Sequence, residues 1–169
     1  MDKHPGGRAH TEYMLELSFL PKGSRWLDMG AGDGSAVEIL NSMGFEATGI
    51  DLEPKGENVI KADFLNTDFD DGSFDGIISQ CAFYISGKPY DALKEAARLL
   101  KKGGKLVFSD VCYDLVEMLN RLREAGFAVR HIDDFTKQWK EYYLEALWTQ
   151  DNVPTGKNCS YVMFACERV

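Results

Sequence analysis

The sequence predicts a doubly wound α/β domain, in which helices cover both faces of a mostly parallel sheet. Short apolar runs with strand character alternate with amphipathic helical stretches along the 169-residue chain. Glycine and proline turns such as "PKGS" and "KKGG" separate them, and no internal repeat interrupts the alternation. Because strands that alternate with helices pair in parallel through right-handed crossovers, this order predicts a Rossmann-like sheet.

The first two thirds of the chain contain three expected helices and five expected strands. Helical spacing of apolar residues predicts helices over "TEYMLELSFL", "SAVEILNSMG" and "PYDALKEAARLLKK", the last stopped by Gly103 and Gly104. Strands are expected at "RWLDMG", "FEATGIDL", "NVIKAD", "SFDGIISQCAFYI" and "KLVFSDV". The chain therefore reads as repeated helix-to-strand units.

The last third continues the alternation. A helix is expected over "YDLVEMLNRLREAG", a strand over "FAVRHIDD", a helix over "FTKQWKEYYLEALW" and a final strand over "CSYVMFACERV". Leu144 and Trp148 lie four residues apart and are expected in the core. Tyr142 and Tyr143 cannot both face inward, so one of them is expected to line a substrate entrance.

Composition and charge restrict the function. A hydrophobic content of 44% suits one domain with a substantial core, and the net charge of -8 with dispersed Lys and Arg argues against a nucleic acid partner. No apolar run reaches the length of a membrane span, and the start lacks the apolar segment of a signal peptide, so a cytoplasmic protein is expected. Cys81, Cys112 and Cys166 lie in apolar runs, which favours buried reduced thiols over a metal site.

A candidate ligand site follows from the strand ends. In a doubly wound sheet, ligands lie beyond the carboxyl ends of the strands, where the sequence places the Gly30, Gly32, Gly34 turn and then Asp51. Glycines let the backbone approach a ligand, and a carboxylate accepts hydrogen bonds from a ribose diol, so a nucleoside is expected. Ser35 stands where the third glycine of the dinucleotide pattern would fall, which disfavours a dehydrogenase.

The run Asp28–Gly34 resembles the D/E-x-G-x-G-x-G motif of class I S-adenosylmethionine-dependent methyltransferases, in particular the type 11 group. Four later segments resemble the same family in the same order: "GIDLE", "ADF", "FDGIISQCAFYI" and "LKEAARLLKKGGKLVFSDV". The resemblance extends from Arg25 to Val111. One departure is that only seven residues join Asp51 to Val59, too few for the helix usual in that crossover, so one face of the cofactor site is expected to be thinner or open.

The resemblance implies a seven-stranded sheet whose last strand is antiparallel and lies between the two preceding strands. It also implies that the cofactor is S-adenosyl-L-methionine, with S-adenosyl-L-homocysteine as the product. Asp28 would favour the ammonium, Asp51 the ribose hydroxyls and Asp63 the adenine amino group. The cofactor-binding residues implied are Asp28, Gly30, Ala31, Gly32, Gly34, Asp51, Leu52, Asp63, Phe64 and Gln80. The alternatives are a turn without ligand, a solvated acid at Asp51 and a purely core role for Phe64.

The acceptor side is less defined. Cys81, Tyr84 and Asp110 follow the fourth and fifth strands and are candidates for shaping the substrate site. In the N-terminal segment, a Gly6-Gly7 hinge precedes Arg8, His10, Thr11 and Tyr13. Arg8 matches a carboxylate in geometry and Thr11 is a further substrate-side candidate; the alternative is an ordinary packing helix after a disordered start. Asp110, Tyr84, His10 and His131 are positional candidates for a general base, and none has a distinctive motif.

The chain is therefore expected to form one methyltransferase domain with an N-terminal lid or helix (1–22), a cofactor-binding core (23–111) and a substrate-side half (112–169). The expected activity is methyl transfer to a small-molecule acceptor by in-line displacement, without a metal. Two alternatives stay open: a methyltransferase acting on a protein or an accessory cofactor, and a non-catalytic nucleoside-binding domain.

Overall fold

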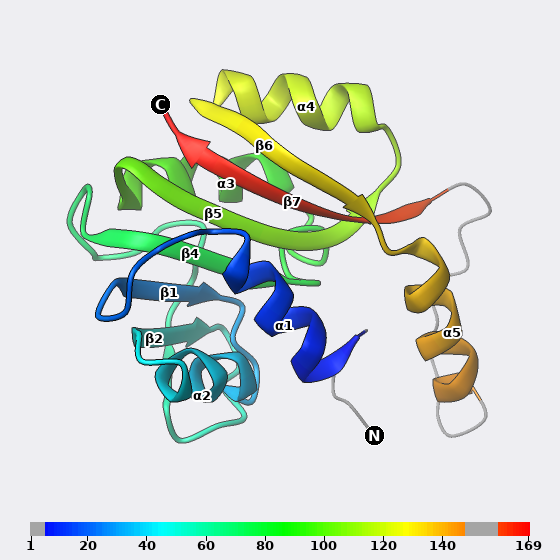
Figure 1. Ribbon diagram of the computed structural model, residues 1–169, viewed down its shortest axis with the longest axis horizontal. Helices are drawn as coiled ribbons and strands as arrows, with labels where there is room; N and C mark the ends of the chain where they lie inside the picture. Colours follow the sequence, from blue (N-terminus) through cyan, green and yellow to red (C-terminus); the bar gives the residue numbers. More distant parts are fainter. Residues whose placement is uncertain (1–5, 148–158) are drawn as a thin grey trace.

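The computed structural model describes residues 6–147 and 159–169, the side chains of residues 144–147 excepted. Its centre is a seven-stranded sheet in the order β3-β2-β1-β4-β5-β7-β6 (Figure 1). Neighbouring strands from β3 to β5 are parallel, whereas β7 is antiparallel to both β5 and β6. The strands are β1 (Arg25–Met29), β2 (Glu46–Asp51), β3 (Val59–Lys61), β4 (Phe74–Gln80), β5 (Leu100–Cys112), β6 (Phe127–Asp134) and β7 (Ser160–Arg168). The predicted doubly wound sheet, with its last strand inserted antiparallel, is confirmed.

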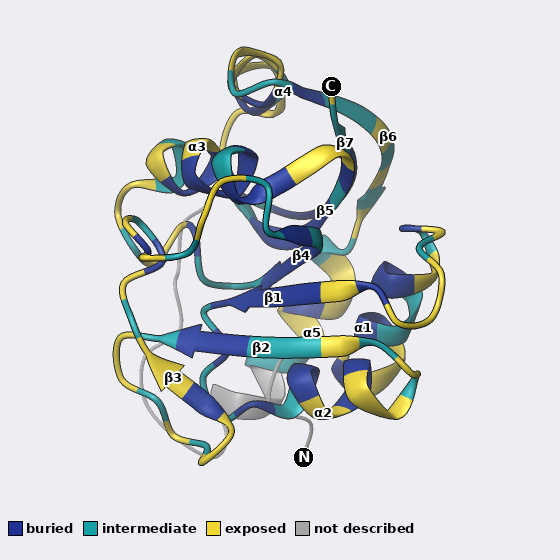
Figure 2. Ribbon diagram, turned by 90° about the vertical axis from the view of Figure 1, so that its left-hand side faces the viewer, coloured by how far each residue is buried: buried dark blue, intermediate teal, exposed yellow. Residues whose placement is uncertain are grey.

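Helices cover the two faces of this sheet in pairs. On one face lie α1 (Gly7–Glu16) and α2 (Ser35–Ser42), and on the other lie α3 (Pro89–Leu99) and α4 (Leu115–Glu124) (Figure 1). A fifth helix, α5 (Thr136–Leu147), lies beyond the ends toward which β1, β2 and β4 point. The central strands are buried, and the helices turn their exposed residues outward (Figure 2).

Among the described residues, two large apolar cores form, one on each face of the sheet, and two smaller clusters lie beside them. Leu27 and Met29 of β1 join the core beneath α3 and α4, while the neighbouring Trp26 joins the core beneath α1 and α2. This division follows from the alternation of side chains along a strand. The sheet is therefore buried from both sides along β1 and β4, and its carboxyl edge is the place where the strand-end residues gather.

Three element boundaries differ from the sequence expectation. The first helix begins at Gly7 rather than at Thr11 and ends at Glu16. The fourth strand ends at Gln80 instead of continuing to Ile85. The third helix ends at Leu99, and the residues that follow it, through the two glycines, belong to β5, which begins at Leu100. The seven-residue connection between β2 and β3 contains no helix, as predicted.

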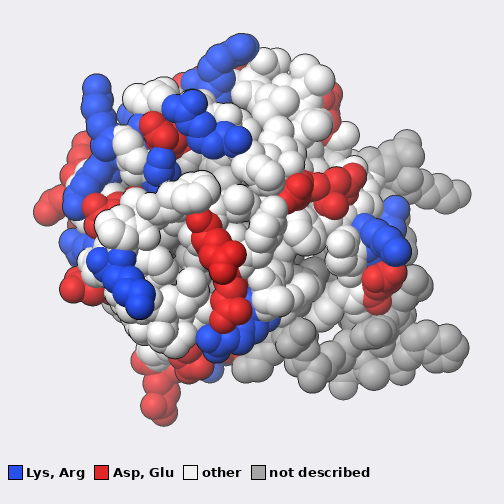
Figure 3. Space-filling view, viewed as in Figure 1, with Lys and Arg blue, Asp and Glu red and all other residues white. Residues whose placement is uncertain are grey.

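The surface shows interspersed charges. On the face seen in Figure 3, acidic side chains stand among the Lys and Arg residues, and no continuous basic band crosses the described part of that face. Among the described residues, no helix has the length and apolar content needed to cross a bilayer. Of the three cysteines expected to be buried, Cys112 and Cys166 are buried and Cys81 is half-buried; Cys159 is buried as well.

Candidate active site

The glycine turn leaves β1 and lies across the end of β2. The amides of Gly30 and Ala31 both donate to the carbonyl of Ile50, at 3.0 and 2.9 Å. A Cβ atom at Gly30 would lie 2.3 Å from Cβ of Ala82, so this glycine is needed for the contact between the turn and the β4–α3 loop. At Gly32, whose φ is +52°, no described atom would lie within 4 Å of a Cβ atom. Gly32 therefore faces open space.

The short connection 52–58 covers the outer side of this turn. The amide of Lys55 donates to the carbonyl of Gly32 at 2.9 Å. A Cβ atom at Gly34 would meet Oδ1 of Asn58 at 2.1 Å, and one at Gly56 would meet the carbonyl oxygen of Asp33 at 2.2 Å. Two glycines thus allow the connection to lie directly on the turn in place of a crossover helix.

Two carboxylates lie beside the turn. Oδ2 of Asp51 accepts a hydrogen bond from the amide of Gly32, and its Oδ1 accepts one from Glu53, both at 2.9 Å. Asp28 is only 3% exposed. Burial, followed by the charges of Asp51 and Asp33, raises the pKa of Asp28 from 3.8 to about 7. The charges acting on Asp28 are negative, so a cation placed near it would be stabilised.

A cleft of about 290 Å³ opens at the carboxyl edge of the sheet. Seven of the residues proposed from sequence line it: Gly30, Asp51, Leu52, Asp63, Phe64, Gln80 and Cys81. Four lining residues were missed, namely Leu65, Ala82, Ile85 and Ser86. Two of the four, Ala82 and Ile85, lie in the segment that was expected to extend β4, and Ser86 follows it directly. The left-handed backbone of Cys81, with φ at +57°, ends the strand there and turns the next residues toward the cleft.

Asp63 and Phe64 enter the cleft from the segment after β3. Asp63 is exposed, and its Oδ1 accepts a hydrogen bond from the amide of Leu65 at 2.9 Å. Phe64 is 7% exposed and its ring centroid lies 5.8 Å from that of Phe83. Phe64 is therefore a core residue that also borders the cleft, so the two roles considered for it are compatible.

The opposite wall is formed by the end of β4, and α1 packs behind it without lining the cleft. The hydroxyl of Thr11 donates to Oε1 of Gln80 at 3.2 Å, and the Gln80 amide lies 3.5 Å from the sulfur of Met14. Next in the chain, the Cys81 thiol lies 3.0 Å from the hydroxyl of Tyr161. Burial raises the pKa of Cys81 to about 12, which keeps the thiol protonated. The N-terminal helix thus orients a residue that lines the cleft.

Asp110 lies outside this cleft. Its carboxylate accepts hydrogen bonds from the amides of Tyr84 at 2.9 Å and Val111 at 2.8 Å. Burial raises its pKa to about 6 despite these amides. Tyr84 and Tyr113 share a hydrogen bond at 3.2 Å at the border of a smaller cavity of about 140 Å³, which Asp110 also lines. Asp110 therefore fixes the β4–α3 loop.

Several sequence candidates are not brought into the cleft. The guanidinium of Arg8, which was expected to face a ligand carboxylate, pairs with Glu12 at 2.7 Å and lies 3.3 Å from the hydroxyl of Ser42 on α2. His10 is buried with its ring 4.4 Å from that of Phe135, and Nε2 of His131 lies 2.9 Å from Asp133. Ala31, Gly32 and Gly34 belong to the turn without lining the cavity.

The aromatic residues of α5 are partly described. Tyr143 contacts the ring of Trp139 at a centroid distance of 5.3 Å, and Tyr142 lies against Tyr143 at 5.2 Å. The expected core contact between Leu144 and Trp148 lies outside the described side chains. Within residues 6–147 and 159–169, no group of three or more His, Cys, Asp and Glu residues is arranged to hold a metal ion.

Comparison with known proteins gives a family match and similar folds. The family described as "Methyltransferase domain" matches residues 27–108. A sarcosine/dimethylglycine N-methyltransferase of Halorhodospira halochloris is 32% identical over 121 residues, which cover 61% of this chain and 43% of that protein. The chain spans less than half the length of the first two curated relatives it matches.

Two solved structures share the fold at 18% identity. Phosphoethanolamine N-methyltransferase 2 of Haemonchus contortus, in complex with S-adenosyl-L-methionine, has a TM-score of 0.80, with 98% of this chain and 53% of that chain covered. The [4+2]-cyclase SpnF has a TM-score of 0.79, with 95% and 81% covered. Because one fold supports different reactions, these similarities establish the architecture alone. The chemistry has to be argued from the residues of the site.

Proposed function

We propose that this chain, whose residues 27–108 match the methyltransferase domain family, transfers a methyl group from S-adenosyl-L-methionine to a small-molecule acceptor. The main support is the cleft at the carboxyl edge of the sheet, which is lined by Gly30 of the turn, the carboxylates of Asp51 and Asp63, the ring of Phe64 and Gln80. Each of these groups has a counterpart in the chemistry of the cofactor. The small-amine methyltransferases among the similar proteins support a small acceptor.

The proposed cofactor site uses the described contacts directly. Each Asp51 oxygen already accepts one backbone hydrogen bond and has a further lone pair available, so the carboxylate is oriented for the two ribose hydroxyls. Leu52, which is 56% exposed in the cleft, and Phe64 offer apolar surface for the adenine ring, while Asp63 offers an acceptor for its amino group.

Asp28 is proposed to hold the ammonium of the cofactor. Burial and the neighbouring negative charges both disfavour the ionised form of Asp28. A bound ammonium would offset both effects, because its positive charge stabilises the carboxylate. Binding would lower the Asp28 pKa and release its proton.

The bound cofactor would supply a methyl group activated by a sulfonium, whose carbon–sulfur electron pair returns to sulfur as the acceptor bonds to carbon. The protein then needs to hold the acceptor about 3–3.5 Å from the methyl carbon and in line with the leaving sulfur. Gln80, held by Thr11, and Cys81, held by Tyr161, are proposed to shape that approach. Asp110 and the protonated Cys81 have structural partners, so no general base is assigned.

A ligand panel tests the proposal. We expect S-adenosylhomocysteine to raise the melting temperature of the full chain, by about 2.7 kcal/mol of stabilisation at a hundredfold excess over Kd, and NAD to give no shift. Differential scanning fluorimetry with S-adenosylmethionine, S-adenosylhomocysteine, NAD and NADP makes the comparison. A shift with NAD alone would overturn the cofactor assignment. Incubation with methyl-labelled cofactor and a panel of small amines and phenols then tests for the acceptor class.

A further inference from the structure

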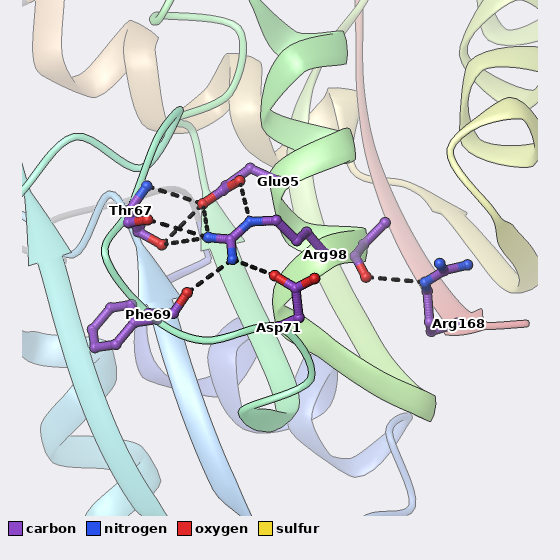
Figure 4. A network of polar contacts seen from close by, with 7 residues as sticks. Thr67, Phe69, Asp71, Glu95, Arg98 and Arg168 are labelled. Carbon is purple, nitrogen blue, oxygen red and sulfur yellow. Dashed lines mark hydrogen bonds and ion pairs between the residues drawn. The ribbon is translucent and has the colours of Figure 1, made fainter.

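A polar cluster joins the segment after β3 to α3, on the adenine side of the cleft (Figure 4). Its centre is the guanidinium of Arg98. Nη1 donates to the carbonyl of Phe69 at 2.8 Å and to Asp71 at 2.6 Å. Nη2 donates to the Thr67 carbonyl at 3.2 Å, and Nε and Nη2 donate to the two oxygens of Glu95 at 2.9 and 2.6 Å. One side chain on α3 therefore fixes three positions of the preceding loop.

Glu95, which lies one turn before Arg98 on α3, completes the cluster. It is 9% exposed, and its Oε1 accepts hydrogen bonds from both the amide and the hydroxyl of Thr67 at 2.9 Å. Burial alone would raise the pKa of Glu95, but the hydrogen bonds from Arg98 and Thr67 outweigh burial and lower it. Glu95 thus stays charged, and the planar guanidinium engages both of its oxygens in the geometry that arginine favours.

The cluster lies a few residues from the groups assigned to adenine. Asp63 begins a turn in which its Oδ1 accepts from the amide of Leu65 and its carbonyl accepts from Asn66 at 3.2 Å. A cavity of about 530 Å³ separates this turn from α3, and Asp63 and Arg98 both line it. The turn is anchored at two places: Phe64 packs into the core, and the amide of Thr67 donates to Glu95 of the cluster.

We propose that Arg98 is a positioning residue for adenine recognition: by fixing Thr67 it sets the place of the Asp63 carboxylate in the cofactor cleft. This inference rests on the proposed function. Arg98 does not line the cofactor cleft itself, so it acts through the loop. Asp63 is exposed, and its position therefore depends on the two ends that anchor its turn.

The test measures discrimination between bases. S-inosylhomocysteine differs from S-adenosylhomocysteine by carrying an oxygen in place of the adenine amino group, which an Asp63 carboxylate would disfavour. Calorimetric Kd values for both ligands are compared in the natural chain, Arg98→Lys and Thr67→Val. We expect the preference for the adenine ligand to fall about tenfold in both variants, the size of one hydrogen bond to a carboxylate. Arg98→Ala is avoided because it leaves the buried Glu95 without its cation.

Arg168→Ala provides the matched control. This arginine also holds α3, through a hydrogen bond from Nε to the carbonyl of Ala97 at 3.0 Å, but on the side away from Thr67 (Figure 4). It should lower the melting temperature and leave the base preference unchanged. An unaltered preference in both test variants would overturn the positioning role while leaving the proposed function intact. If the natural chain binds neither ligand, the proposed function itself fails.

Discussion

At the scale of single residues, the three glycines of the turn serve different neighbours. Gly30 makes room for Ala82 and Gly34 for Asn58, so their roles are explained by contacts within the protein. Gly32 has no such neighbour among the described residues, although its φ is +52°. A side chain at Gly32 would project into space that the fold leaves open. A substitution there can therefore test ligand binding with little effect on packing.

We expect Gly32→Val to abolish S-adenosylhomocysteine binding and to leave the chain folded. A valine in the left-handed region costs about 1–2 kcal/mol, which a domain of this size tolerates, whereas its methyl groups would occupy the open space beside the cleft. Circular dichroism checks the fold, and ligand-induced thermal stabilisation checks binding.

Gly23→Val is the appropriate control for that substitution. Gly23 also has a positive φ, at +83°, and open surroundings, and it lies before β1 at the opposite edge of the sheet. Gly23→Val should lower the free energy of unfolding by about as much as Gly32→Val does. It should keep the thermal stabilisation by S-adenosylhomocysteine. Equal ligand responses in Gly32→Val and Gly23→Val would remove the reason for assigning the turn to the cofactor.

The raised pKa of Asp28 predicts that cofactor binding depends on pH. Only the ionised carboxylate attracts an ammonium, so affinity for S-adenosylhomocysteine should fall as the pH drops below about 7, approaching tenfold for each unit. In the free chain the sign is opposite: the stability that Asp28 contributes at acidic pH is lost as the pH rises through about 7. Calorimetric titration from pH 8 to pH 6 measures the first effect.

Asp28→Asn should bind more weakly at pH 8 and show a flatter pH profile, because the titrating group is absent. It should also be more stable than the natural chain at pH 8 in the absence of ligand. A profile that is equally steep in both proteins would place the titrating group elsewhere, with Asp110, whose pKa is about 6, as the next carboxyl to replace.

At the scale of elements, the sequence predicted the order and the types of all the described helices and strands, and it failed at their ends. The helical pattern at Leu100–Lys102 becomes strand because Leu100 pairs with Phe74 of β4, which local spacing cannot show. The apolar run after Gln80 leaves the sheet because Cys81 adopts a left-handed backbone. In the first case a tertiary contact overrides the helical pattern, and in the second a single backbone conformation ends the strand.

The candidate site was predictable where it follows strand ends. Gly30, Asp51, Asp63 and Gln80 lie together because parallel strands present their carboxyl ends at one edge. Arg8 was not predictable in this way. The orientation of its side chain depends on its place in α1 and on the ion pair with Glu12 one turn later. The sequence predicted that the helix begins at Thr11, which left Arg8 outside it.

The short connection 52–58 predicts an unusual sensitivity to added bulk. A Cβ atom at Gly56 would lie 2.2 Å from a backbone oxygen, so Gly56→Ala must push the connection off the glycine turn. We expect a loss of about 1–3 kcal/mol together with weaker cofactor binding. Gly56 is not among the glycines with a positive φ, so the loss would come from the clash and not from backbone strain. Glu57→Ala, at an exposed position in the same connection, is the control. Urea unfolding compares the two, and a smaller loss in Gly56→Ala would contradict the contact.

At the scale of the whole molecule, the cleft lies where the two cores end. Phe64 and Phe83 belong to the core beneath α3 and α4, and Met14, which touches Gln80, belongs to the core beneath α1 and α2. A ligand in the cleft would contact groups attached to both layers. Its binding would therefore stabilise the two halves of the domain together, which is consistent with the large thermal shift expected for the cofactor.

The place of β7 has a consequence for biosynthesis. This strand separates β5 from β6, yet the ribosome makes it after both of them. Until residues 160–168 have emerged, β5 displays an unpaired edge of backbone amides and carbonyls, and β6 has no strand to pair with. Edges of this kind bind other chains or chaperones, so during synthesis the parallel part of the sheet is exposed until β7 covers β5.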